Sequence, residues 1–156
     1  MKIIDKSSEK EVESELITDF SAYGSLSFHV FVAIFLLILD LTLFEKYGLT
    51  MLATYLVLIV LRSFYFDKRP WKKKTYKTLV EKIDMNSKFS SHSASSFAFA
   101  ITIGLSTTTP IFIFLLVFAF LVGLSRIKLR KHRPTNVLNG AIIGIIVSLI
   151  INLLVF

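Results

Sequence analysis

The sequence Ser125-Arg126-Ile127-Lys128-Leu129-Arg130-Lys131-His132-Arg133-Pro134-Thr135-Asn136 lies between two strongly apolar segments. It is basic, it carries one histidine, and it ends in a Pro-Thr-Asn step before the last apolar run. Proline fits the first turn of a helix because its missing N–H would have no partner there. We therefore expect a helix that begins at about Pro134, with His132 just outside it. If the helical path reaches back to His132, its imidazole and the Asn136 amide share a face within hydrogen-bonding reach.

The composition is that of a polytopic membrane protein. Of 156 residues, 54% are hydrophobic, 13% are aromatic and only 19% are charged, and the mean hydropathy is +0.68. A soluble domain would carry about 25% charged residues. The apolar residues are gathered into long runs, as membrane spans require. The absence of cysteine excludes disulfide and thiolate chemistry.

The apolar runs predict an all-α integral membrane helical bundle of about five transmembrane helices. The first run, Leu26–Phe44, has 19 residues, enough for roughly 28 Å of helix. After a polar turn at 45–48, the other runs are Gly48–Phe66, Ser90–Ile103, Ile111–Leu124 and Val137–Phe156. Gly140 and Gly144 in the last run predict close helix packing.

Two polar segments complete the organisation. Residues 1–24 predict a polar surface segment that is either a short helix at 9–20 or a loose tail, too polar for the apolar core of a signal peptide. Residues 25–156 form one membrane-embedded domain. The connection 67–89 favours an interfacial amphipathic helix, with apolar residues at 76, 79, 80 and 83, lysines on the other face, and Trp71 and Tyr76 as anchors. The alternative is a solvated connector. His29 and Asp40 are interpreted as near-interface residues or as residues paired within the bundle.

The distribution of Lys and Arg predicts which side faces the cytoplasm. With five spans, the N-terminal tail, residues 62–88 and the 125–136 stretch lie on one side and carry 17 of the 18 basic residues, whereas Lys46 lies on the other. We therefore expect a protein of the cell membrane. By the positive-inside rule, its basic side, which includes the N-terminus, faces the cytoplasm. Because the basic residues sit beside apolar spans, the formal charge of +7 favours anionic lipid headgroups over nucleic acid as the partner.

Three separated pieces of sequence then fall on this face. In the first, Arg62 and Arg69 are seven residues apart, so two helical turns bring them to within about 20° of one another. In the second, Ser90-Ser91-His92 opens a helix, where backbone N–H groups and the helix dipole favour an anion. The third runs from Arg126 to Asn136. A single arginine near a span end is usually a snorkelling anchor. Only the three pieces taken together therefore indicate a functional site.

Together the pieces resemble the type-2 phosphatidic acid phosphatase superfamily, which includes membrane lipid phosphate phosphatases, bacterial acid phosphatases and vanadium haloperoxidases. The family signature is K-x6-R-P, then P-S-G-H, then S-R-x5-H-x3-D. This chain has Arg62-x6-Arg69-Pro70, then Phe89-Ser90-Ser91-His92, then Ser125-Arg126-x5-His132-x3-Asn136. The resemblance covers about residues 62–144.

The resemblance implies a site and a mechanism without metal or cofactor. His132 matches the nucleophile that forms a phosphohistidine, and His92 matches the general acid that protonates the departing lipid oxygen. Further residues match the groups that bind the phosphate: Arg62, Arg69, Arg126, Ser90 and the amide of Ser91. Fixed positive charge, an in-line nucleophile and a proton for the leaving group are what phosphoryl transfer requires. Arginine suits a phosphate-binding site because its planar guanidinium group binds phosphate oxygens in pairs.

The chain departs from the signature at Arg62, Phe89, Ser91 and Asn136. The change from aspartate to Asn136 matters most, because an amide can hold the imidazole tautomer but supplies no charge to the imidazolium. We therefore keep two hypotheses. The first is a phosphatase acting on a polyprenyl phosphate or diphosphate, or on a phosphatidate-like lipid, whose tail enters sideways between helices. The second is a weak or inactive relative that binds lipid phosphates or serves as a membrane scaffold.

Overall fold

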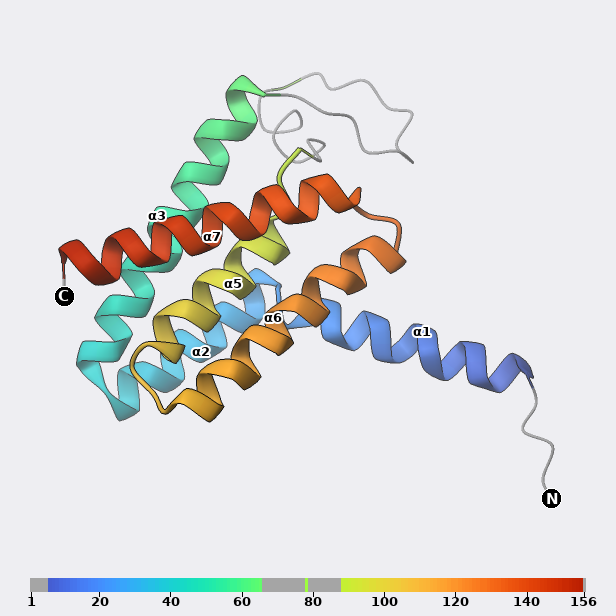
Figure 1. Cartoon of the computed structure of the whole chain (residues 1–156), viewed down its shortest axis with the longest axis horizontal. Helices are drawn as coiled ribbons and strands as arrows, with labels where there is room; N and C mark the ends of the chain where they lie inside the picture. The colour runs from blue at the N-terminus through green and yellow to red at the C-terminus, as the bar shows by residue number, and fades with distance from the viewer. Residues whose placement is uncertain (1–5, 66–77, 79–87, 156) are drawn as a thin grey trace.

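The computed structural model of the chain describes residues 6–65, 78 and 88–155, with side chains from residue 14 onward. Every regular element within these residues is a helix. They are α1 (Lys6–Ala22), α2 (Leu26–Leu39), α3 (Leu41–Phe64), α5 (Ser91–Gly104), α6 (Thr109–Lys128) and α7 (Pro134–Leu154). Figure 1 shows five of them gathered in a bundle, while α1 projects to one side. The all-α prediction is confirmed for the described part of the chain.

Three of the described helices, α3, α6 and α7, are long and apolar enough to cross a membrane. The pair Ser14–Ala22 and Leu26–Leu39, bent by 51°, counts as a fourth if it forms one span. Helices α2 and α5 have 14 residues each, or about 21 Å of helix, which is short of a hydrocarbon core of about 30 Å. A helical membrane bundle is therefore confirmed, with fewer spans by length and composition than the expected five.

The first turn between apolar helices lies at Asp40, and the turn predicted at 45–48 is wrong. Asp40 has an extended backbone (φ −154°, ψ 102°), and its carboxylate accepts a hydrogen bond from the Leu43 amide at 3.0 Å. It is therefore the N-cap of α3, which continues unbroken through Gly48. An aspartate cap stabilises a helix start by about 1 kcal/mol, and one interior glycine costs a similar amount without breaking a helix. Asp40 is exposed at this helix end.

The other polar residue of the first run, His29, is paired inside the bundle as expected. Its Nδ1 and the hydroxyl of Tyr47 share a hydrogen bond of 2.7 Å, and both side chains are buried. The rings of Phe28 and Phe99 lie against the imidazole. This contact joins α2 to α3.

Helix α5 is the centre of the bundle, in contact with α3, α6 and α7. It can lie there because its buried side chains are mostly small: Ser93, Ala94, Ser95, Ser96, Ala98, Ala100 and Thr102. Two glycines of α7 let the backbones approach. A Cβ at Gly140 would lie 2.3 Å from the Ser90 carbonyl oxygen, and one at Gly144 would lie 2.1 Å from the Ala94 carbonyl oxygen. The packing role predicted for this glycine pair is confirmed.

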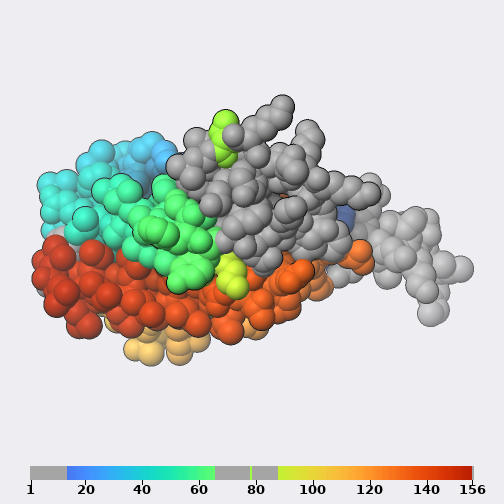
Figure 2. All heavy atoms as spheres, turned by 90° about the horizontal axis from the view of Figure 1, so that it is seen from above, coloured from blue at the N-terminus to red at the C-terminus, as the bar shows by residue number. Residues whose placement is uncertain are grey.

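The outside of the bundle is apolar. Large exposed side chains lie on α2, α3, α6 and α7, among them Phe31, Phe64, Phe114 and Leu153. Figure 2 shows α7 lying alongside α3 on one face of the molecule. Such a surface matches a lipid environment, in which apolar side chains face outward without a hydrophobic penalty.

Two further predictions concern the polar segments. The N-terminal surface helix is present and longer than predicted, since α1 spans Lys6–Ala22 and packs on α6. The interfacial amphipathic helix predicted between 67 and 89 lies outside the described residues.

Candidate active site

Hydrogen bonds join three segments: the C-terminus of α3, the N-terminus of α5 and the connection from α6 to α7. The Ser90 amide donates to the Asn136 carbonyl oxygen at 3.0 Å, which joins the second segment to the third. Nη2 of Arg62 donates to the Phe89 carbonyl oxygen at 2.5 Å, which joins the first segment to the second. The described residues of the three sequence pieces therefore lie together.

Helix α5 begins in a buried position at the end of the bundle where these segments join. Ser90 is its N-cap, fully buried, and its hydroxyl accepts from the Ser93 amide at 3.4 Å. Ser91 and His92 form the first turn, both half-buried. The first amides of a helix have no intrahelical acceptor and lie at the positive end of the dipole. This helix start suits an anion, as the sequence predicts.

The α6–α7 connection fixes the position of His132. Arg130 takes a left-handed backbone conformation (φ 54°), which ends α6. The amides of Lys131 and His132 then both donate to the Arg126 carbonyl oxygen, at 3.0 and 3.3 Å. The Lys131 hydrogen bond, together with the Arg130 amide donating to the Ile127 carbonyl oxygen at 2.9 Å, is typical of a helix C-terminal cap with a left-handed residue. His132 is thereby held next to the last turn of α6, with only 5% of its surface exposed.

Helix α7 begins at Pro134, as predicted, and Arg133 is its N-cap. The helical path therefore does not reach back to His132, and the shared helical face with Asn136 is not formed. Asn136 lies in the first turn of α7 with 2% of its surface exposed. Its side-chain oxygen accepts from the Thr135 hydroxyl at 3.4 Å.

The electrostatics of the site centre on two histidines and an arginine. His92 lies close enough to Arg126, His132 and Lys131 for their charges to act on it. Arg126 comes from the last turn of α6 and is 7% exposed, so its charge is directed into the protein. His92 comes from the start of α5, whereas Arg126 and His132 come from the end of α6 and the connection after it, and together they form a largely buried corner that carries the Arg126 charge. Such a corner attracts a phosphate group.

The first arginine pair is only partly described. Arg62 lies in the last turn of α3, half-buried. The helix ends at Phe64 because Tyr65 is extended (φ −107°, ψ 119°), so the continuous helix expected from Arg62 to Arg69 is wrong at this point. Arg69 itself lies outside the described residues.

Two residues at this end of the bundle were not among the predicted site residues. Nη1 of Arg126 donates to the hydroxyl of Ser21, near the end of α1, and Gly24 packs directly against His92. Both residues precede the first apolar run, in the segment interpreted as a surface element. A Ser and a Gly near a helix end are common turn residues, so nothing in the sequence distinguished them.

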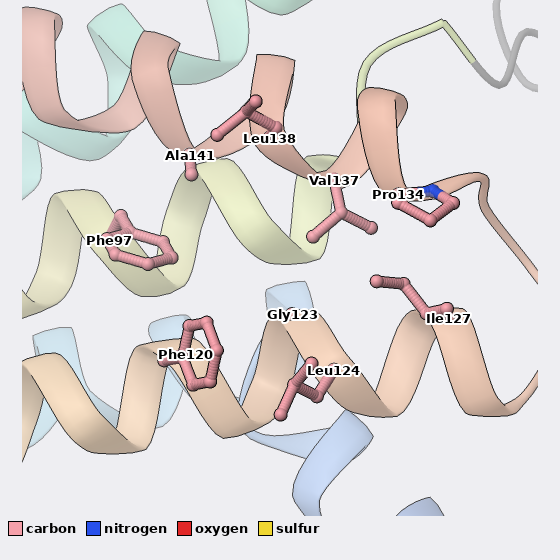
Figure 3. A pocket seen from close by; sticks show the side chains of 9 residues that line it. All are labelled: Phe97, Phe120, Gly123, Leu124, Ile127, Pro134, Val137, Leu138 and Ala141. Atoms are coloured by element: carbon pink, nitrogen blue, oxygen red, sulfur yellow. The ribbon is translucent and has the colours of Figure 1, made fainter.

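An apolar groove begins beside the α6–α7 connection (Figure 3). It lies between α6 and α7 and has a volume of about 180 Å³. Ile127 and Pro134 lie at the end near the connection, and Phe97 and Phe120 lie at the other end. The remaining lining residues are Gly123, Leu124, Val137, Leu138 and Ala141. The groove thus extends from the segment that carries His132 as far as Phe120 on α6 and Ala141 on α7.

Comparison with known proteins defines the class. The family model of the PAP2 superfamily matches residues 43–156, and the chain belongs to this family. The structure is similar to the crystal structure of Aquifex aeolicus LpxE, with a TM-score of 0.77 and 26% sequence identity, over 90% of this chain and 86% of that chain. No curated protein matches the sequence. Family and fold together support a membrane-bound lipid phosphatase.

Proposed function

We propose that the chain hydrolyses a lipid phosphomonoester or diphosphate through a phosphohistidine intermediate. The observation that carries the proposal is that the start of α5, which bears His92, is hydrogen-bonded to the α6–α7 connection, which bears His132 and is itself bonded to Arg126. A phosphate bound at this end of the bundle would lie near both imidazoles and the Arg126 guanidinium. This is the arrangement that phosphoryl transfer needs, because catalysis consists of positioning and charge stabilisation.

In the first half-reaction, the His132 imidazole attacks the terminal phosphorus while the bond from that phosphorus to the lipid oxygen breaks (for a diphosphate, the bond to the bridging oxygen, which leaves with the lipid monophosphate). The electron pair of that bond stays on the lipid oxygen, which takes a proton from His92. In the second half-reaction, neutral His92 takes a proton from water as the water oxygen attacks phosphorus. The phosphorus–nitrogen bond then breaks, and inorganic phosphate and His132 are regenerated. No metal ion enters either step of this proposal.

The phosphate oxygens would be held by positive groups from each segment. Arg126 and Arg62 supply guanidinium groups, and Arg69 is assigned the same role from the sequence signature. Ser90 and the amide of Ser91 add donors at the start of α5. The charge and the positions of the phosphoryl oxygens change during the transfer. Donors fixed to match the changed arrangement stabilise the transition state more than the ground state.

The substrate class follows from the apolar groove. We assign it to the hydrocarbon tail of a polyprenyl phosphate or diphosphate, or of a phosphatidate-like lipid. Its lining is aliphatic and aromatic, and it starts at the connection that carries His132. A lipid with its headgroup at His132 would therefore have its tail beside the groove, and the tail can enter sideways from the bilayer.

A second candidate is a weak or inactive relative that binds lipid phosphates without turnover. The observation that favours it is Asn136, whose amide stands in a buried position where the family signature has a carboxylate. An amide gives the His132 imidazolium no ionic partner, and in a serine-protease triad the corresponding change costs about 10⁴ in kcat.

Phosphate release from detergent-solubilised lipid phosphates separates the two candidates. The phosphatase proposal expects release by the wild type and none by His132→Ala or His92→Ala. Equal rates in the wild type and His132→Ala, with lipid phosphate binding retained in both, would leave only the binding function.

A further inference from the structure

The corner between α1 and α2 packs against the candidate active site. Helix α1 ends at Ala22, and α2 begins at Leu26 after its N-cap, Ser25, whose hydroxyl accepts from the Phe28 amide at 3.3 Å. The chain bends by 51° between the two helices. The corner residues, 21–25, precede the part of the chain that matches the PAP2 family model.

One contact of the corner reaches the guanidinium of Arg126. The Ser21 hydroxyl accepts a hydrogen bond from Nη1, and the two side chains are 5% and 7% exposed. A hydroxyl is an uncharged acceptor, so it fixes the direction of the guanidinium without neutralising it. A carboxylate in the same place would hold the arginine more strongly but would compete with a phosphate for its charge.

A second contact reaches His92. A Cβ at Gly24 would lie 2.7 Å from the His92 Cβ, 2.9 Å from its carbonyl oxygen and 2.9 Å from Cγ1 of Val122. The Ser95 hydroxyl lies 3.2 Å from the Gly24 carbonyl oxygen and 3.3 Å from the His92 carbonyl oxygen, so it ties the corner to the first turn of α5. Only a glycine allows this approach.

From these contacts we infer that the α1–α2 corner is a positioning element of the phosphate site. Ser21 directs the guanidinium of Arg126, and Gly24 sets the position of the His92 backbone. The inference rests on the proposed function, since it concerns the same site. It adds a fourth segment to the three in the family signature, and neither residue touches the phosphate itself. Residues that orient binding groups in this way matter because small displacements of those groups weaken catalysis strongly.

The test for Ser21 compares Ser21→Ala with Ser14→Ala, the same change at an exposed site on the same helix. We expect Ser21→Ala to lower kcat/KM by roughly tenfold, as loss of an orienting partner commonly does, and to weaken binding of inorganic phosphate by a similar factor. Ser14→Ala should match the wild type in both measurements. Calorimetric titration measures the affinity for inorganic phosphate without any turnover.

A double-mutant cycle separates positioning from a structural effect. If Ser21 acts through Arg126, Ser21→Ala should change phosphate affinity by less than about twofold in an Arg126→Lys background. A full further loss in that background would show that Ser21 acts independently of the arginine and would overturn its assigned role.

Gly24→Ala is the test for the second contact, with Gly48→Ala as its control because a Cβ at Gly48 meets nothing within 4 Å. We expect Gly24→Ala to lower kcat roughly a hundredfold by displacing His92, and Gly48→Ala to leave it unchanged. The same kcat for Gly24→Ala and the wild type would contradict the role of Gly24.

The outcomes distinguish the inference from the proposed function. A wild type that releases no more phosphate from lipid than His132→Ala would refute the proposed function. An active wild type, together with Ser21→Ala that binds inorganic phosphate as tightly as Ser14→Ala, would refute the inference and leave the proposed function standing.

Discussion

The backbone amide of Ser90 donates to the backbone carbonyl of Asn136 at 3.0 Å, which fixes the start of α5 against the start of α7. This bond joins residues 46 positions apart in the chain. It brings the segment with His92 to the segment with His132. The close approach depends on Gly140, one turn further along α7, because a side chain there would meet the Ser90 carbonyl oxygen.

Gly140→Ala should therefore disrupt the site through the backbone. Its Cβ would lie 2.3 Å from the Ser90 carbonyl oxygen and 3.2 Å from the Ser90 nitrogen, so α5 and α7 must separate. Overpacking of this kind destabilises proteins by about 1–3 kcal/mol. We expect a lower melting temperature in detergent and a lower kcat, and Gly48→Ala should show neither effect. An unchanged melting temperature would mean that the helices do not pack as described.

Restoring the carboxylate by Asn136→Asp should raise kcat. The family signature implies that the side chain at position 136 orients His132, so a carboxylate there would stabilise the imidazolium as well as its orientation, whereas the amide supplies no charge. We expect kcat to increase by about tenfold or more. This gain is smaller than the loss of about 10⁴ in kcat known for the serine-protease triad, because the Asn136 amide can already hold the useful tautomer. Asn139→Asp, one turn further along α7, adds the same charge and is the control. A rate that stays at the wild-type level in Asn136→Asp would favour the binding function.

Narrowing the groove should discriminate between substrates by tail length. Ala141→Phe fills part of the apolar groove between α6 and α7, whereas Leu149→Phe changes an exposed residue of α7 that does not line it. We expect Ala141→Phe to raise KM for long-chain lipid phosphates by about tenfold, equivalent to about 1.4 kcal/mol of lost tail binding, with little change for a short-chain analogue. Equal effects on both substrates would place the tail elsewhere.

Sidedness is tested by labelling introduced cysteines in sealed cells, because the chain has none of its own. Lys128→Cys marks the end of α6 next to the site, and Glu45→Cys marks the opposite end, where Asp40 and Lys46 lie close to Ser106. Both positions are exposed. The positive-inside rule leads us to expect labelling of Glu45→Cys by an impermeant maleimide and protection of Lys128→Cys. The reverse pattern would place the site outside the cytoplasm.

Much of the fold was predictable because membrane helices leave strong apolar runs. The start of α7 at Pro134 and the packing role of Gly140 also follow from the sequence, since each depends on local chemistry. The turn was misplaced at 45–48 because a Glu-Lys-Tyr-Gly step resembles a loop more than a helix interior. The cap at Asp40 was overlooked because a carboxylate inside an apolar run was interpreted as an interface or paired residue.

The candidate site was predictable where its residues follow a spaced signature, as His92, Arg126 and His132 do. Ser21 and Gly24 were not, because their role arises from tertiary contacts with segments about 70 to 105 positions away. Nothing local to residues 21–24 encodes those contacts. The helical face expected for His132 and Asn136 also failed, because the cap of α6 at Arg130 and the proline at the start of α7 leave His132 between two helices.

The central claim is that His132 becomes phosphorylated while His92 supplies the proton. The most direct measurement is rapid alkaline quenching of the wild type during turnover of a lipid phosphate, followed by mass spectrometry of its peptides. We expect a phosphohistidine at His132, formed in Asn136→Asp as well and absent from His132→Ala. Turnover that persists in His132→Ala, or phosphate carried by a different residue, would contradict the claim.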